Sequence, residues 1–116
     1  MQTKRRKRKR MRLKERERDV VQVIRQGLER LGYRVLHCGQ QRADKSGSDP
    51  GLPDLFVSHP RWPAGVWIGL ECKSTVGRLS TAQRALAATR RIVIVRNWED
   101  ALSTARETWN ALQSAP

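Results

Sequence analysis

The sequence has few acidic residues, only two cysteines and no long apolar stretch, and the last two shortages each exclude a class of protein. Lys and Arg number 24 against 11 Asp and Glu, so the formal net charge is +13. Cys38 and Cys72 are too few and too far apart for a zinc pattern or a disulfide scaffold. No stretch approaches the ~20 apolar residues of a membrane span. We therefore expect a soluble, intracellular protein with reduced cysteines.

The positive charge is concentrated near the N-terminus. Residues 1–18 hold eleven Lys and Arg against Glu15 and Glu17, a balance of +9. Because this basic run has no apolar face, we expect residues 1–15 to form a disordered arm until they meet phosphates. A secretory signal would need an apolar segment after its charges, which is missing here. Nucleic acid is therefore the expected partner, ahead of an anionic membrane surface.

The rest of the chain, residues 16–113, has the length of one small domain. Apolar residues recur at helical spacing over 16–31, and Gly32 follows as a stop signal. Ser80 and Asn97 are the expected N-caps of two later helices. The other patterns predict strands at 33–38, 54–58, 65–73 and 92–95, helices at 81–89 and from 98 onward, and a long loop at 39–53. The order α-β-β-β-α-β-α predicts an α/β fold in which the second and third strands form an antiparallel hairpin.

Charged side chains stand at the ends of two predicted strands. Asp54 begins one apolar run, and Glu71 and Lys73 close the next. Because side chains alternate along a strand, Glu71 and Lys73 share a face and Cys72 points away. Two carboxylates can hold a hard divalent cation, and the lysine can orient an attacking water, so the pattern predicts metal-assisted phosphodiester hydrolysis. The plainer alternatives are a turn acid at Asp54 and a solvated charge pair at Glu71 and Lys73.

Three short motifs resemble those of a known family. They are the segments 51–55 (GLPDL), 71–73 (ECK) and 77–80 (GRLS), with Gln83 one helical turn further on. Together they resemble the VRR-NUC branch of the PD-(D/E)xK nuclease superfamily, over roughly residues 17–102. The resemblance implies a restriction-endonuclease-like core, in which a mixed sheet is flanked by helices. It also implies dependence on Mg²⁺ or Mn²⁺.

The resemblance implies a role for each residue of these motifs. Asp54, Glu71 and the backbone carbonyl of Cys72 would be the metal ligands. Lys73 would orient or activate the attacking water and stabilise the transition state. Gln83 would support the site from the helix that follows, although a glutamine in the first turn of a helix is also commonplace.

A glutamate on the first helix is a further residue that the family places at its site. Glu15 and Glu17 compete for this role. Glu17 lies on the same helical stripe as the apolar positions Val20, Val21 and Ile24, and Glu15 projects elsewhere. Glu17 is therefore the expected catalytic residue, or a ligand of a second metal, although an acid at a helix start is also favoured by the helix dipole.

Branched DNA, such as a Holliday junction or a flap, is the substrate that the resemblance implies, in a bacterial or phage-infected cell. It also implies a homodimer, as is thought of small stand-alone members. The residues expected to contact nucleic acid are basic, namely Lys4, Arg5, Arg6, Lys7, Arg8, Lys9, Arg10 and Arg78. The rival interpretation is a non-catalytic DNA- or RNA-binding protein on a nuclease fold. Against it stands the complete set of two acids and a lysine.

Several other conspicuous residues are expected to pack rather than react. Trp62 and Trp67 could stack on bases, but their spacing favours packing in the core or in a dimer interface. The same holds for the two cysteines and for His37 and His59. A membrane-surface protein would need an amphipathic helix with large exposed aromatic side chains, and none is evident.

Overall fold

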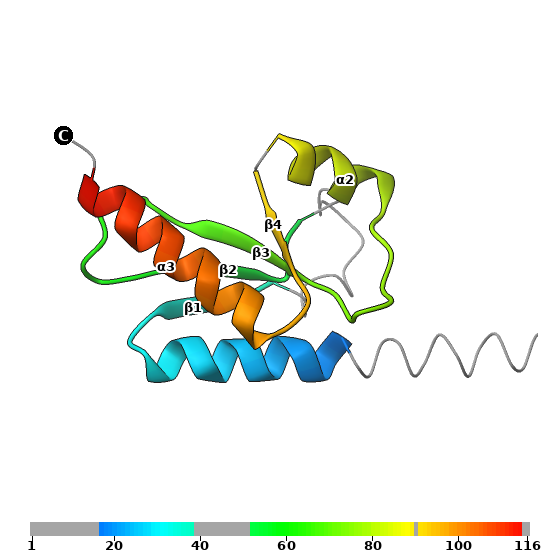
Figure 1. The fold of residues 1–116 in the computed structure, drawn as a ribbon, viewed down its shortest axis with the longest axis horizontal. Coiled ribbons are helices and arrows are strands. Elements are labelled where there is room, and N and C mark those ends of the chain that lie inside the picture. Colours follow the sequence, from blue (N-terminus) through cyan, green and yellow to red (C-terminus); the bar gives the residue numbers. More distant parts are fainter. Residues whose placement is uncertain (1–16, 39–51, 90, 115–116) are drawn as a thin grey trace, which may run out of the picture.

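The computed structural model describes residues 17–38, 52–89 and 91–114. Within these ranges, a first helix over residues 17–30 is followed by four strands and two more helices (Figure 1). They are β1 (Arg34–His37), β2 (Leu55–Ser58), β3 (Ile68–Cys72), α2 (Thr81–Ala88), β4 (Val93–Val95) and α3 (Trp98–Ser114). The predicted α/β fold and the order α-β-β-β-α-β-α are confirmed. The expected arm and most of the predicted long loop lie outside the described residues.

The four strands form one mixed sheet in the order β1-β2-β3-β4. β1 pairs with β2 and β2 pairs with β3 in antiparallel register, so the predicted hairpin is confirmed. β3 and β4 are parallel, with Leu70 opposite Val93 and Cys72 opposite Val95. A parallel pair needs a long crossover connection, and the segment that contains α2 supplies it. This arrangement brings the start of β2 beside the end of β3.

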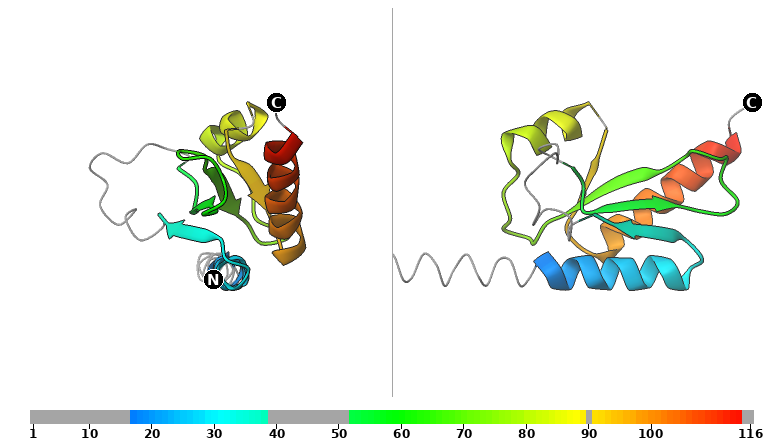
Figure 2. Two further views of the ribbon diagram at one scale, coloured as in Figure 1. Left: turned by 90° about the vertical axis from the view of Figure 1, so that its left-hand side faces the viewer. Right: turned by 180° about the vertical axis from the view of Figure 1, so that it is seen from behind.

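The core lies on one face of the sheet. Leu55, Val57, Leu70, Cys72 and Val95 point to this face and are almost fully buried. Side chains from the first helix and from α3 complete the cluster, and α2 lies apart from both helices (Figure 2). Each fully buried aliphatic side chain stabilises the fold by about 1.5–3 kcal/mol. Since β-strand side chains alternate, residues 54, 71 and 73 belong to the opposite face.

Local interactions end and begin the helices where the sequence predicts. Gly32 has a φ of 91°, which a glycine adopts without strain. Its amide donates to the carbonyl of Glu29, and the amide of Tyr33 donates to that of Leu28, which is a Schellman ending. The side chain of Asn97 accepts from the amide of Asp100 at 2.8 Å, as expected of an N-cap.

The two tryptophans near the hairpin differ in environment. Trp62 is only 7% exposed and packs as predicted. Trp67 is 42% exposed and does not pack in the core, so of the two expected environments the dimer interface stays a prediction. The physical reason is its phase, because Trp67 precedes β3 by one residue and shares a face with Gly69 rather than with the core residues Leu70 and Cys72.

Within the residues that the structure describes, no helix is long and apolar enough to cross a membrane.

Candidate active site

Asp54 and Glu71 are brought together by the β2–β3 register. Leu55 pairs with Leu70, and this register carried one residue further sets Asp54 opposite Glu71. Residues opposite each other on antiparallel strands have side chains on the same face. The Asp54 carboxylate is held in place, because its Oδ2 accepts from the backbone amide of Cys72 at 2.9 Å. Two carboxylates therefore meet at one end of the sheet.

Glu71 is the most deeply buried charged residue of this cluster. It is 1% exposed, so the alternative of a solvated charge pair is wrong for this residue. Its Oε1 accepts from Gln83 Nε2 at 2.9 Å and lies 3.7 Å from Lys73 Nζ. The side chain of Lys73 is itself only 13% exposed. A buried carboxylate needs such partners, since burial without them would cost several kcal/mol.

Gln83 is oriented by the start of α2. The Ser80 hydroxyl accepts from the Gln83 amide at 3.1 Å, and the Ser80 amide donates to Gln83 Oε1 at 2.9 Å. This reciprocal pair is a capping box, as the spacing of the two residues allows. With its oxygen engaged by Ser80, the side-chain NH₂ faces Glu71. Gln83 thus completes the cap of α2 and also supports the Glu71 carboxylate.

The Cys72 thiol lies on the core face, while its backbone belongs to the site. Burial raises the pKa of this thiol above its usual range, and the negative charges of Asp54, Glu71 and Glu17 raise it further. The protonated thiol is a packing group, in agreement with the prediction for Cys72. The amide of Lys73 donates to the carbonyl of Val95 on β4. Since the backbone groups of successive residues in a strand point to opposite sides, the N–H and C=O of Cys72 point toward β2, where Asp54 lies.

Cys72 should resist alkylation in the folded protein. We expect iodoacetamide at about pH 8.5 to modify the half-buried Cys38 first and Cys72 only after unfolding, because a thiol with a raised pKa holds little thiolate. Because its pKa is raised, this thiol loses its proton less readily in the folded protein than in the unfolded chain. Its contribution to the free energy of unfolding is therefore fully present below the unfolded pKa of about 8.5 and is lost as the pH rises above that value. Intact-mass spectrometry counts the modified thiols. Equal rates at both cysteines in the native protein would contradict this assignment.

Glu17 reaches the turn that follows Lys73. A Cβ atom built on Gly77 would lie 2.8 Å from Glu17 Oε1 and 3.4 Å from Lys73 Cδ. The carboxylate and the lysine chain therefore approach the same point, and the glycine leaves room for both. Glu17 also lies close enough to raise the pKa of Cys72. Glu15, its competitor in the sequence, lies outside the described residues.

Arg96 is a part of the site region that sequence reasoning missed. Its guanidinium donates to the carbonyls of Ser74 and Gly77, the latter at 2.9 Å. The Arg96 amide donates to Asp100 Oδ2 at 3.0 Å, which ties the residue to the start of α3. Arg96 thus connects the end of β4 to the turn that follows Lys73, which Glu17 also approaches. An arginine after a buried strand has no local signal that would reveal these partners.

Removal of the Arg96 guanidinium should destabilise the protein. We expect Arg96→Met to lower the free energy of unfolding by about 1–3 kcal/mol, because two carbonyls lose a charged donor. The matched control is Arg91→Met, an exposed arginine before β4, with an expected change within about 0.5 kcal/mol. Urea unfolding followed by circular dichroism measures both. An equal loss in the two variants would show that the contacts of Arg96 are unimportant.

The donor atoms of the cluster suit a hard cation. Within the described ranges, no three His, Cys, Asp or Glu side chains are grouped as ligands of a metal ion. Mg²⁺ keeps several waters and commonly takes only one or two protein carboxylates. Asp54, Glu71 and the carbonyl of Cys72 are such a set of oxygen donors, without the thiolates or imidazoles that zinc prefers. The residues present therefore fit Mg²⁺ or Mn²⁺.

The basic residues predicted to contact nucleic acid are placed only in part. Arg78 is exposed on the segment between the Ser74–Gly77 turn and α2. Residues 4–10 lie outside the described residues.

No protein-family model matches the chain, and no characterised protein or solved structure matches it either. Fold and geometry alone thus describe an α/β protein with two carboxylates, a lysine and a glutamine gathered at the ends of neighbouring strands.

Proposed function

We propose that the protein is a metal-dependent nuclease that hydrolyses phosphodiester bonds in branched DNA. The observation that carries the proposal is the arrangement around Glu71, a buried carboxylate that contacts Lys73 and Gln83 and lies opposite Asp54. The resemblance of these residues to the VRR-NUC motifs and the net charge of +13 support it. We place this activity in the cytoplasm of a bacterial or phage-infected cell.

Each residue of the cluster has a chemical task in this proposal. Asp54, Glu71 and the Cys72 carbonyl would hold Mg²⁺ or Mn²⁺, which when bound neutralises charge on the phosphate. Lys73 orients the attacking water and stabilises the negative charge that develops on the phosphoryl oxygens. Gln83 keeps the Glu71 carboxylate in position through its hydrogen bond. Glu17 adds a carboxylate from the first helix, as a further catalytic residue or a ligand of a second metal.

The decisive experiment is a cleavage assay with Mg²⁺ and with Mn²⁺. Labelled four-way junction, 5′ flap, splayed duplex and linear duplex are incubated with the wild type and with Lys73→Ala. We expect metal-dependent cutting of a branched substrate, lost in the variant. If the wild type binds all four substrates and cuts none with either metal, the protein is a non-catalytic DNA- or RNA-binding protein on a nuclease fold.

We also propose a homodimer with two active sites. Leu36 and Trp67 are 55% and 42% exposed, and both belong to the sheet face opposite the core. A second copy of the chain could cover these side chains and double the surface that grips branched DNA. We expect light scattering at micromolar concentration to give a dimer mass, and Trp67→Lys to reduce it. A monomer mass with and without DNA would contradict the proposal.

A further inference from the structure

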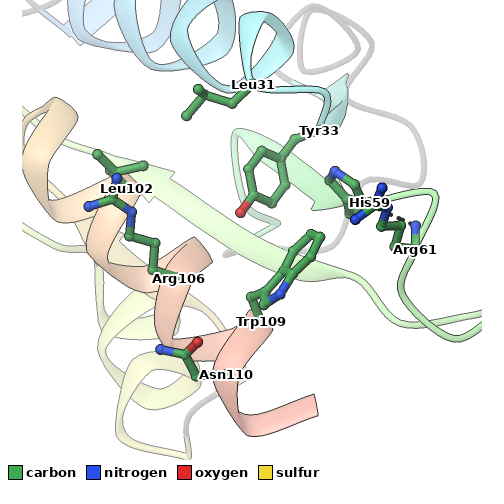
Figure 3. Close-up of a pocket in the computed structure, with 8 residues that line it drawn as sticks. All are labelled: Leu31, Tyr33, His59, Arg61, Leu102, Arg106, Trp109 and Asn110. Atoms are coloured by element: carbon green, nitrogen blue, oxygen red, sulfur yellow. Dashed lines mark hydrogen bonds between the residues drawn. The ribbon is translucent and has the colours of Figure 1, made fainter. Parts of the chain in front are cut away.

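A cavity of about 660 Å³, lined in part by Tyr33, His59 and Trp109 (Figure 3), lies at the end of the sheet opposite the carboxylate cluster. Tyr33 precedes β1, His59 follows β2, and Trp109 comes from α3. Asp54 stands five residues before His59, which is roughly 17 Å along an extended strand. The cavity is therefore separate from the candidate active site. Its volume falls within the range of about 300–1,000 Å³ that is usual for small-molecule and cofactor sites.

Aromatic rings form one wall of this cavity. The rings of His59 and Trp109 have centroids 4.6 Å apart at 79°, and those of Tyr33 and His59 are 5.0 Å apart at 78°. The buried Trp62 packs behind Tyr33, and the centroids of these two rings are 5.7 Å apart. The amide of Arg61 donates to His59 Nδ1 at 3.1 Å and thereby fixes that ring. The wall is thus held in place before any ligand arrives, and its rings suit a planar aromatic ligand.

Positive charge stands beside these rings. Arg61 and Arg106 both line the cavity from opposite sides in Figure 3, and both are exposed. Among the residues that the structure describes, no carboxylate forms a salt bridge with either arginine, and the lining contains no Asp or Glu. The charge of Arg106 reaches Tyr33, where it opposes the rise in pKa that burial causes. Arginines without acidic partners beside aromatic rings suit a ligand that is both planar and anionic.

We propose that this cavity binds one nucleotide unit of a single-stranded nucleic-acid segment. The base stacks against the Tyr33, His59 and Trp109 wall, and the flanking phosphate lies between Arg61 and Arg106. Base stacking on aromatic residues tolerates every base, so sequence preference is weak. The proposal does not depend on hydrolysis at Glu71, because stacking and ion pairing need no metal. A splayed strand that left the active site could reach such a site at the far end of the sheet.

The test measures binding of a short oligodeoxythymidine to the full chain by fluorescence anisotropy, in EDTA. We expect Trp109→Leu to weaken binding by about 5- to 160-fold, the range that corresponds to loss of one stacking partner. Val23→Ala is the matched control, an exposed apolar residue on the first helix, and should change affinity less than about twofold. Arg106 is exposed, so Arg106→Glu should not disturb folding, and its affinity for the oligonucleotide is compared with that of Arg91→Glu. Circular dichroism verifies that each variant folds.

Location is tested by photocrosslinking. An oligonucleotide that carries iododeoxyuridine should crosslink to peptides that contain Tyr33, His59 or Trp109. Crosslinks confined to other peptides, equal losses in the variants and their controls, or a lack of oligodeoxythymidine binding would overturn the proposal. It would also be overturned if Trp109→Leu dissociated a dimer, since a second copy would then fill the cavity. Junction cleavage that persists without oligodeoxythymidine binding would overturn this proposal alone.

Discussion

Glu71→Gln should abolish cleavage of branched DNA while binding stays intact or becomes tighter, and Asp54→Asn should do the same. Each change keeps the size of the side chain and removes one negative charge near the phosphate. Loss of one group that stabilises developing charge typically costs about 100- to 1,000-fold in rate, and loss of a metal ligand should cost at least as much. In Glu71→Gln the new amide oxygen can still accept from Gln83, so the fold should persist.

The measurement compares cleavage rates in Mg²⁺ and Mn²⁺ with affinity for the same junction. The matched control is Glu107→Gln, an exposed glutamate on α3, which should cleave like the wild type. Wild-type turnover in either Asp54→Asn or Glu71→Gln would remove the site assignment. Loss of both cleavage and folding in Glu71→Gln would leave Asp54→Asn as the deciding variant, because Asp54 is less buried than Glu71.

Removal of residues 1–14 should weaken DNA binding strongly and flatten its dependence on salt. This segment holds nine Lys and Arg. Each phosphate that a basic side chain neutralises contributes about −0.9 to the slope of log K against log salt for duplex DNA. With 6–10 such contacts, affinity falls by about 10³- to 10⁵-fold between roughly 50 and 200 mM salt. The rate of cleavage of bound DNA should not change, since the removed segment contains none of the candidate site residues Asp54, Glu71 and Lys73.

A second variant separates charge from chain length. Replacing the seven basic residues 4–10 by glutamine keeps the length of the chain and should reproduce most of the effect. Anisotropy titrations at several salt concentrations give the slope for each protein, and single-turnover cleavage at saturating enzyme gives the rate. An unchanged slope in both variants would show that this segment does not contact phosphate. A slower single-turnover rate would mean that it also positions the substrate.

The sequence by itself determined the elements and much of the local geometry. The stop at Gly32 and the caps at Ser80 and Asn97 depend on residues within a few positions, so the sequence alone predicts them. The alternation of strand side chains likewise placed Glu71 and Lys73 on one face with Cys72 turned away. The α/β fold followed from the order of these elements, and the structure confirms it.

Only the tertiary structure decided which distant residues meet. The opposition of Asp54 to Glu71 depends on strand register, and Arg96 reaches carbonyls 22 and 19 residues earlier in the chain. The wall of Tyr33, His59 and Trp109 likewise depends on how α3 packs beside the start of β1 and the end of β2. Local sequence signals act over about one helical turn or one strand, whereas these contacts arise from packing of the whole chain.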